Sequence, residues 1–202
     1  MDTSPLNLPR ALLTAVNKLT QVLDEAGVKY ALIGGLAAGY RSRPRFTQDV
    51  DLLLHIPQLA LPALLDKLQL EGFQFDTKTV IHEWNAEHLT VLSYAGVRVD
   101  WLKPVLPCFQ HVLDTARIET WLDSPVRIAS AEALILLKLI SFRQQDVADI
   151  EALLAANRGE LDLEWIHREL ATVVSADDPR MQRLQELLND FYVAPDDSGN
   201  LP

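Results

Sequence analysis

Apolar residues recur at helical spacing in the first part of the chain. The pattern predicts an amphipathic helix over residues 8–26 that ends at Gly27, with an inward face formed by Leu12, Leu13, Val16, Leu19 and Leu23. A short apolar strand over residues 30–33 follows and turns at Gly34-Gly35. A second helix is predicted over residues 57–70, with its buried face formed by Leu61, Leu64, Leu65 and Leu68.

The pattern then changes to short runs typical of strands. We expect strands over residues 79–82, 88–93 and 97–101, with Ala95-Gly96 as the turn of a hairpin. A short helix over residues 108–115 and a strand over residues 126–129 complete this half of the chain.

The last third of the chain is predicted to be helical. Ser130 is a candidate N-cap for a helix through Phe142 that is apolar nearly all round and should therefore be buried. Asp146 is read as the cap of the next helix, with Asp149 three residues on. Helices over residues 164–173 and 179–191 follow.

The pattern therefore predicts an α+β fold. We expect a small mixed sheet with helices on one side, followed by a C-terminal helical bundle. The predicted boundaries are an α/β core with its N-terminal helix at 1–128, a helical region at 129–193 and a disordered tail at 194–202.

Composition narrows the class of protein. The single cysteine, Cys108, excludes an internal disulfide and suits a reducing compartment. No signal peptide or membrane span is read, so we expect a cytoplasmic protein with no membrane partner. The net charge of -10 argues against a broad nucleic-acid-binding surface, although Arg41, Arg43 and Arg45 form a local basic patch.

The chemistry concentrates between residues 31 and 54. Asp49 and Asp51 are two apart on a predicted strand, so their side chains share one face. Two adjacent carboxylates on an apolar strand are costly unless they are neutralised, which a hard cation such as Mg²⁺ achieves. The alternative is that they are ordinary turn or solvent-facing residues.

The turn before this strand offers the other half of a site. Without side chains, Gly34 and Gly35 allow backbone N–H groups to approach a phosphate closely, and a helix beginning nearby would favour an anion. Arg43 and Arg45 follow, and guanidinium groups match phosphate oxygens. The segment thus reads as a phosphate cradle, a basic loop and a metal-binding pair.

At this point the sequence resembles the DNA polymerase β-type nucleotidyltransferase superfamily. The residues that carry the likeness are G-G at 34–35 and R-x-R-F-T-x-D-x-D-L-L-L at 43–54. The likeness is greatest to the AbiEii-type and minimal bacterial nucleotidyltransferases. It implies a nucleotidyltransferase fold, a triphosphate held by the glycine loop, and Mg²⁺ held by the D-x-D pair with a third carboxylate. The family often has serine where this chain has Gly35.

Asp100 is the candidate for that third carboxylate, because it follows on a neighbouring predicted strand. Its alternative is an ion pair with Arg98, which shares its face. Lys138, with Arg143 and the two aspartates after it, matches a second feature of the family, and the likeness then spans roughly residues 30–155. Lys138 either binds phosphate or snorkels from a buried helix, and the aspartates either cap a helix or join the site.

The resemblance implies transfer of a nucleoside monophosphate from an NTP to a hydroxyl on RNA, protein or a small molecule. Asp49, Asp51 and Asp100 would be catalytic and bind two Mg²⁺ ions. Gly34, Gly35, Arg43, Arg45 and Lys138 would bind the triphosphate. The AbiEii likeness adds a toxin with an antitoxin partner and a tRNA or protein acceptor. The rival hypothesis is a non-catalytic module that keeps the fold and binds a nucleotide or a partner.

Overall fold

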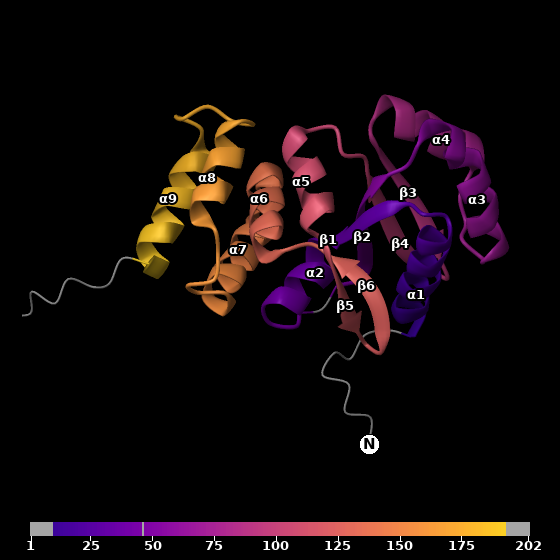
Figure 1. The fold of residues 1–202 in the computed structure, drawn as a ribbon, viewed down its shortest axis with the longest axis horizontal. Coiled ribbons are helices and arrows are strands. Elements are labelled where there is room, and N and C mark those ends of the chain that lie inside the picture. The colour runs from indigo at the N-terminus through magenta and orange to yellow at the C-terminus, as the bar shows by residue number, and fades with distance from the viewer. Residues whose placement is uncertain (1–9, 46, 193–202) are drawn as a thin grey trace, which may run out of the picture.

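A six-stranded mixed sheet lies at the centre of the protein, with strand order β3-β4-β2-β1-β6-β5 (Figure 1). The computed structural model describes residues 10–45 and 47–192, so the tail predicted at 194–202 and the first two residues of the predicted N-terminal helix lie outside the described residues. The strands are β1 (Lys29–Ile33), β2 (Asp49–His55), β3 (Leu89–Tyr94), β4 (Val97–Leu102), β5 (Arg117–Trp121) and β6 (Ser124–Ile128).

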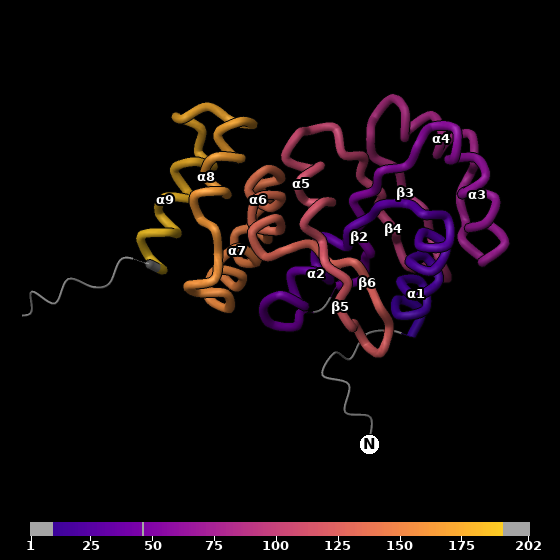
Figure 2. The backbone as a smooth tube through the Cα atoms, in the orientation of Figure 1, coloured from indigo at the N-terminus to yellow at the C-terminus, as the bar shows by residue number. Residues whose placement is uncertain are grey.

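Helices surround this sheet and continue beyond it. They are α1 (Arg10–Glu25), α2 (Gly34–Arg41), α3 (Leu61–Leu70), α4 (Thr77–Ala86), α5 (Pro107–Thr115), α6 (Ala131–Ser141), α7 (Gln144–Ala156), α8 (Leu163–Ala171) and α9 (Pro179–Tyr192), with a short 3₁₀ helix η1 (Gln58–Ala60) before α3. Figure 2 shows α6 to α9 gathered at one end of the molecule and α1, α3 and α4 at the other. The predicted α+β class and the C-terminal helical region are confirmed.

Strand register decides which side chains share a face. β1 runs antiparallel to β2, and β2 runs parallel to β4, with Asp51 opposite Asp100. The parallel pairing of β1 with β6 makes the sheet mixed. The predicted Ala95-Gly96 hairpin between β3 and β4 is present, and both turn residues have positive φ, as such a turn requires.

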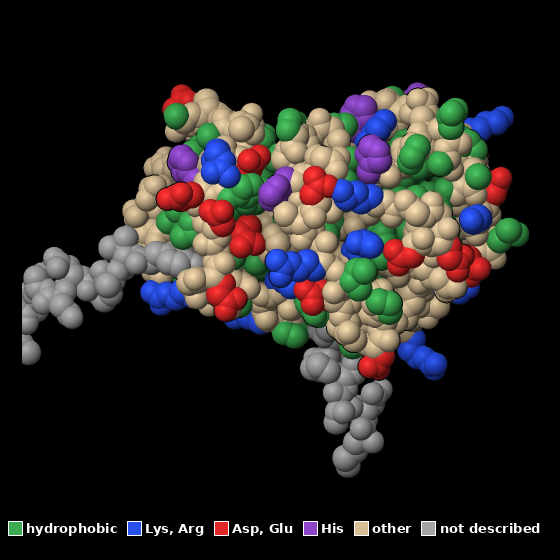
Figure 3. Space-filling model, in the orientation of Figure 1, with side chains coloured by type: hydrophobic (Ala, Val, Ile, Leu, Met, Phe, Trp, Pro, Cys, Tyr) green, Lys and Arg blue, Asp and Glu red, His purple; other side chains and the backbone are tan. Residues whose placement is uncertain are grey.

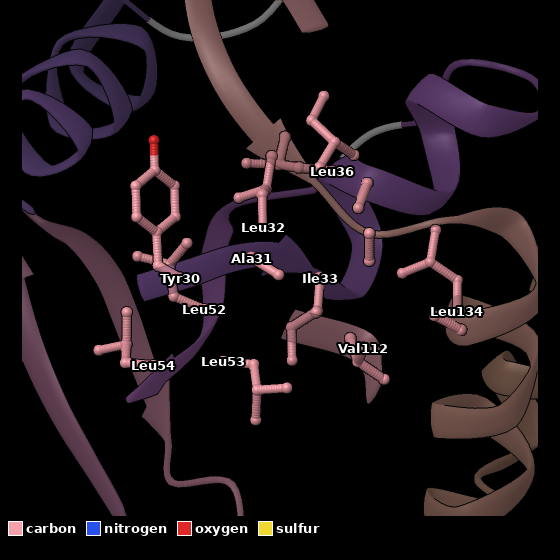
Figure 4. Packing of buried hydrophobic residues seen from close by; sticks show 14 of the residues in the cluster. Tyr30, Ala31, Leu32, Ile33, Leu36, Leu52, Leu53, Leu54, Val112 and Leu134 are labelled. Carbon is pink, nitrogen blue, oxygen red and sulfur yellow. The ribbon is translucent and has the colours of Figure 1, made fainter. Parts of the chain in front are cut away.

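Both faces of the central strands are covered. Tyr30 projects toward α1, where its hydroxyl donates to Asp24 at 3.3 Å. Ile33 and Leu53 project the other way, toward Val112 of α5 (Figure 4). The expectation of helices on one side only is therefore wrong: β1 and β2 are apolar on both faces, and each apolar face needs a covering helix.

The segment predicted as a strand over residues 79–82 is instead part of α4. Thr, Val and Ile in this segment favour strands, but Asp76 caps a helix by accepting hydrogen bonds from the Thr79 amide at 2.7 Å and its hydroxyl at 2.8 Å. Val80 and Trp84, four residues apart, are the buried face of this helix. Capping and burial of Trp84 outweigh the local β propensity.

Two further predictions at element ends need correction. The strand β5 was not predicted, because its turn to β6 is formed by Leu122 and Asp123 at positive φ rather than by glycine. The second C-terminal helix, α7, is capped by Arg143, and Asp146 lies at its third position with its carboxylate accepting from the Arg143 amide at 3.0 Å. Asp146 thus caps the helix from its first turn, as the N3 residue of a capping box, and not as the N-cap residue.

The buried face predicted for the second helix is confirmed and can be tested within one helix. Leu68 is fully buried, whereas Leu70, two residues further along α3, is 88% exposed. We expect Leu68→Ala to lower the free energy of unfolding by about 2–5 kcal/mol, because it leaves a cavity. Leu70→Ala should change it by less than about 0.5 kcal/mol. Chemical denaturation measures both, and equal losses would contradict the packing of α3.

Candidate active site

The turn between β1 and α2 forms the floor of the candidate site. Gly34 has a φ of +65°, and a Cβ on it would lie 2.0 Å from Oδ2 of Asp51. Only glycine satisfies both the backbone angle and this close approach. The helix α2 begins at Gly34 and has no side-chain cap, and its Gly35 amide donates to Asp51, so its first N–H groups face the carboxylate region.

The structure brings the three predicted carboxylates to one face of the sheet. Asp49 and Asp51 lie two apart on β2, and Asp100 is the register partner of Asp51 on β4. All three side chains are partly exposed. Because strand pairing holds neighbouring carboxylates together, their negative charges interact directly.

Asp51 shows the consequence of this crowding. Burial, followed by the charge of Asp100, raises the pKa of Asp51 to about 6, with Asp49 adding to the effect. A hydrogen bond from the Gly35 amide and the charge of Lys138 act in the opposite direction. The net result is a carboxylate that lacks sufficient positive charge around it.

Asp100 is held by a neighbour on its own strand. The Arg98 Nε atom donates to both carboxylate oxygens of Asp100, at 2.8 and 3.0 Å. The ion pair that was the alternative interpretation of Asp100 is therefore present. The Asp100 side chain is 22% exposed and the Arg98 side chain 54% exposed, so the pair lies at the solvent boundary.

The carboxylates suit a hard cation by their chemistry, although they are not arranged as a finished metal site. Across the residues that the structure describes, no group of three or more His, Cys, Asp or Glu side chains is arranged so that it could hold a metal ion. The three side chains offer only oxygen atoms as donors, which Mg²⁺ prefers. The pKa of Asp51 is raised by its burial and by the charge of Asp100, so a cation beside it would be stabilising. The donor chemistry therefore suits Mg²⁺, but Arg98 occupies Asp100 in this structure.

A buried ion network supplies the cations. The Lys138 ammonium lies 2.5 Å from Oδ2 of Asp149 and 3.2 Å from Oδ1 of Asp146. Arg45 binds the same Asp149, with its Nε atom 2.8 Å from Oδ1. Lys138 is only 5% exposed, so its snorkelling alternative is wrong. Asp149 is not a helix cap but the shared anion of two cations.

This network places Arg45 over the glycine turn. A Cβ on Gly35 would lie 2.8 Å from Nη2 of Arg45 and 3.0 Å from Oγ1 of Thr47. The guanidinium and the hydroxyl therefore lie against the backbone that was predicted to cradle phosphate. Thr47 was not among the predicted site residues; its place two residues before Asp49 was the available signal.

The other two arginines of the predicted basic loop lie elsewhere. Arg41 ends α2 and joins it to the end of β6, with Nε donating to the Ala129 carbonyl at 3.0 Å and Nη1 2.9 Å from Glu119. Arg43 is exposed and lines a surface groove with residues of α7 and with Phe191. No described contact brings Arg43 to the carboxylates, so its predicted phosphate role stays a prediction.

The fold is that of a nucleotidyltransferase-like protein. The solution structure of the antibiotic-resistance factor ANT(2'')-Ia matches with a TM-score of 0.56 at 13% identity, covering 93% of this chain and 100% of that chain. The crystal structure of ANT(2'')-Ia in complex with adenylyl-2''-tobramycin matches with a TM-score of 0.51 at 15% identity, covering 80% of this chain and 95% of that one. These likenesses define the fold.

The family follows from the sequence itself. Residues 12–186 match the family described as "Nucleotidyl transferase of unknown function (DUF2204)", and the chain belongs to this family. An antigenic nucleotidyltransferase-like protein from Paracoccidioides brasiliensis is 21% identical, with a TM-score of 0.48, and the match covers 92% of this chain and 98% of that one. A search of curated proteins found no match. The AbiEii likeness stays a prediction.

The described part of the chain also bears on membrane association. None of its helices combines the length with the apolar character that crossing a bilayer requires.

The raised pKa of Asp51 makes a prediction about stability. Between roughly pH 4 and 6 the folded protein keeps a proton that the unfolded chain has released, so the free energy of unfolding falls as pH rises through this window. Asn cannot ionise. With a chelator present at about pH 8, the Asp51→Asn variant should therefore unfold at a higher temperature than the wild type. Its free energy of unfolding should be larger by up to about 3 kcal/mol. The difference should shrink toward about pH 4.

The control for this experiment is Asp66→Asn, which removes an exposed carboxylate from α3. It should leave the pH dependence of thermal unfolding unchanged. If Asp51→Asn were less stable than the wild type at about pH 8, the burial and neighbouring charge that raise the pKa of Asp51 would not decide the effect of the substitution.

Proposed function

We propose that this protein is a Mg²⁺-dependent nucleotidyltransferase. It transfers a nucleoside monophosphate from an NTP to a hydroxyl group of an acceptor and releases pyrophosphate. The observation that carries the proposal is the placement of Asp49, Asp51 and Asp100 on one sheet face, directly beside the uncapped N-terminus of α2. Family membership supports the reaction class.

The roles of the carboxylates follow from their positions. Asp49 and Asp51 would hold two Mg²⁺ ions, and Asp100 would join them. Bound Mg²⁺ would neutralise charge on the phosphates and on the attacking and leaving oxygens. Asp100 would accept the proton of the acceptor hydroxyl. The hydroxyl oxygen would then bond to the α-phosphorus of the NTP while the bond from that phosphorus to pyrophosphate breaks. Asp100 is suited to this because it lies at the solvent boundary.

The triphosphate would lie on the side of Asp51 that faces the glycine turn, away from Asp100. The amides of Gly34 and Gly35 and the positive end of α2 would receive it, and Arg45 and Lys138 would balance its charge. Both cations are already held in place by Asp149, and Lys138 also contacts Asp146. Arg43 would assist from the loop. Such catalysis rests on positioning and on charge neutralisation.

The acceptor is an RNA, a protein or a small molecule. ANT(2'')-Ia, whose crystal structure holds an adenylylated tobramycin, supports the small-molecule class through fold likeness alone. The AbiEii resemblance supports the toxin of a toxin–antitoxin pair, with an antitoxin as partner and a tRNA or protein as acceptor.

The second candidate function is a nucleotide-binding module without catalysis. The observation that favours it is the Arg98–Asp100 ion pair, which occupies the proposed proton acceptor. Arg98 is largely exposed, so it can turn into solvent when a substrate arrives.

Substitution of single carboxylates separates the two candidates. Asp51→Asn should abolish the thermal stabilisation that Mg²⁺ with an NTP gives the wild type, because it removes a metal ligand. Asp100→Asn should keep most of that stabilisation, because the glycine turn and the D-x-D pair remain. It should lower transfer of labelled NMP by about 100- to 10,000-fold. Thermal melts and transfer assays with each of the four NTPs measure both effects.

The outcomes assign the function directly. Undiminished transfer by Asp100→Asn would remove Asp100 from the site. A wild type that binds NTP with Mg²⁺ but labels nothing in RNA, lysate protein or small-molecule pools would favour the binding module. Absence of any stabilisation by all four NTPs would contradict both candidates. Asp66→Asn, far from the site on α3, should behave as the wild type throughout.

Expression in bacteria tests the toxin. Induction of the wild-type chain alone should arrest growth, because an active transferase would modify an essential acceptor. Asp49→Ala should relieve the arrest by removing a metal ligand, whereas Asp66→Ala, at an exposed position of α3, should not. Growth curves and plating efficiency, with protein levels matched by immunoblot, give the readout. Normal growth at high wild-type expression would count against a toxin.

A further inference from the structure

A cleft of about 440 Å³ lies at the far end of α2 from the carboxylates. We call it the α5–α8 cleft; its walls come from α5, β5, the start of α6, the end of α7 and α8, and include Arg41, His111, Arg117, Glu132, Asn157 and Trp165. Its volume falls in the range of small-molecule sites. None of the three carboxylates, the glycine turn or Lys138 lines it.

An aromatic platform forms one part of the wall. The His111 ring of α5 stacks on the Trp165 ring of α8, with centroids 4.5 Å apart and an angle of 29° between the planes. Trp165 is only 7% exposed, whereas His111 is exposed. A flat ring backed by a buried tryptophan and open to solvent is the kind of surface on which a nucleobase stacks.

A positively charged side chain, Arg117, also lines the α5–α8 cleft. Arg117 is exposed, and within the described part of the chain its side chain makes no hydrogen bond or ion pair, although its backbone pairs with β6. Arg41 is different, because its guanidinium is fixed by Glu119 and by the carbonyls of Ala129 and Ile128. The uncommitted guanidinium of Arg117 is therefore the group available to a phosphate.

Carboxylates limit what else the cleft accepts. Asp162 is engaged as the cap of α8, where it accepts from the Trp165 amide at 2.8 Å, and Glu132 accepts from the Asp162 amide. Glu160 remains exposed at the rim. On the face shown in Figure 3, acidic and basic side chains are interspersed rather than gathered by sign. A large polyanion is therefore disfavoured, and a single phosphate beside a ring is favoured.

We propose that the α5–α8 cleft binds one nucleotide unit, its base stacked on His111 and its phosphate on Arg117. This site is separate from the proposed transfer site: Arg41 and Gly34 are seven residues apart at opposite ends of α2, about 10 Å along the helix axis. The unit is a free nucleotide, because the carboxylates around the cleft disfavour a polyanion; a nucleotide of a single-stranded RNA is the alternative that the experiment distinguishes. The proposal does not depend on metal binding or on transfer.

The experiment is therefore designed so that neither metal binding nor nucleotidyl transfer can contribute to the signal. AMP and a short single-stranded oligoadenylate are titrated in a chelator into the Asp51→Asn variant, which lacks a complete metal site, and into the wild type. Binding is followed by calorimetry. Saturable binding of AMP identifies a free nucleotide, and binding of the oligoadenylate alone identifies an RNA nucleotide. Both proteins should bind equally.

Two variants assign the binding to this cleft. His111→Ala should weaken binding by roughly 5- to 100-fold through loss of stacking, and Arg117→Glu should abolish it by placing a negative charge against the phosphate. The matched controls are His82→Ala on α4 and Lys67→Glu on α3, both exposed and remote from the cleft. Thermal melts confirm that each variant is folded.

The negative results are equally defined. If neither AMP nor the oligoadenylate binds, or if His111→Ala and Arg117→Glu bind as the controls do, the α5–α8 cleft is not a nucleotide site. Such a result would leave Mg²⁺–NTP binding at the carboxylates untouched, because that binding is measured with metal in the wild type. Loss of Mg²⁺–NTP binding with retained AMP binding would instead overturn the proposed transfer site alone.

Discussion

Repulsion among carboxylates that strand register forces together is the constraint on which the site depends. Asp49 and Asp51 cannot turn away from one another, because side chains two apart on a strand share a face, and parallel pairing sets Asp100 beside Asp51. The surrounding core holds this arrangement: Leu52 and Val99 on the opposite face are fully buried. Packing energy maintains a charge distribution that would not persist in a flexible segment.

The structure balances this charge at short range without cancelling it. Lys138 and Arg45 carry the compensating charges, but both are paired with Asp149, a carboxylate on α7. A buried cation needs a partner: Asp149 pairs with both cations, and Asp146 pairs with Lys138 as well. The result is an alternation of signs from the sheet to the C-terminal helices, with α2 between them in contact with β1, β2, α6 and α7 (Figure 2). An incoming anion would therefore meet fixed cations.

How far the sequence predicts this structure varies with the range of the interaction. Periodicity locates α1, α3 and the buried α6, and alternation puts Asp49 and Asp51 on one face, because these depend on neighbouring residues. Sequence fails at α4, where the Asp76 cap and the burial of Trp84 outweigh β-branched residues. It also misses the roles of Asp149, 104 residues from Arg45, and of His111, which stacks on Trp165. Such pairs are created by tertiary packing and leave no local pattern.

The helices α2 and α6 connect the two candidate sites. At one end, α2 begins against Asp51, and α6 presents Lys138 to the same carboxylate. At the other end, Arg41 joins α2 to the chain entering α6, and the Asn157 side chain donates to the Arg41 carbonyl at 3.0 Å. The two helices thus run in opposite directions between the carboxylates and the α5–α8 cleft. Arg41 and Asn157 therefore tie the cleft to the helix whose first residues form the glycine turn.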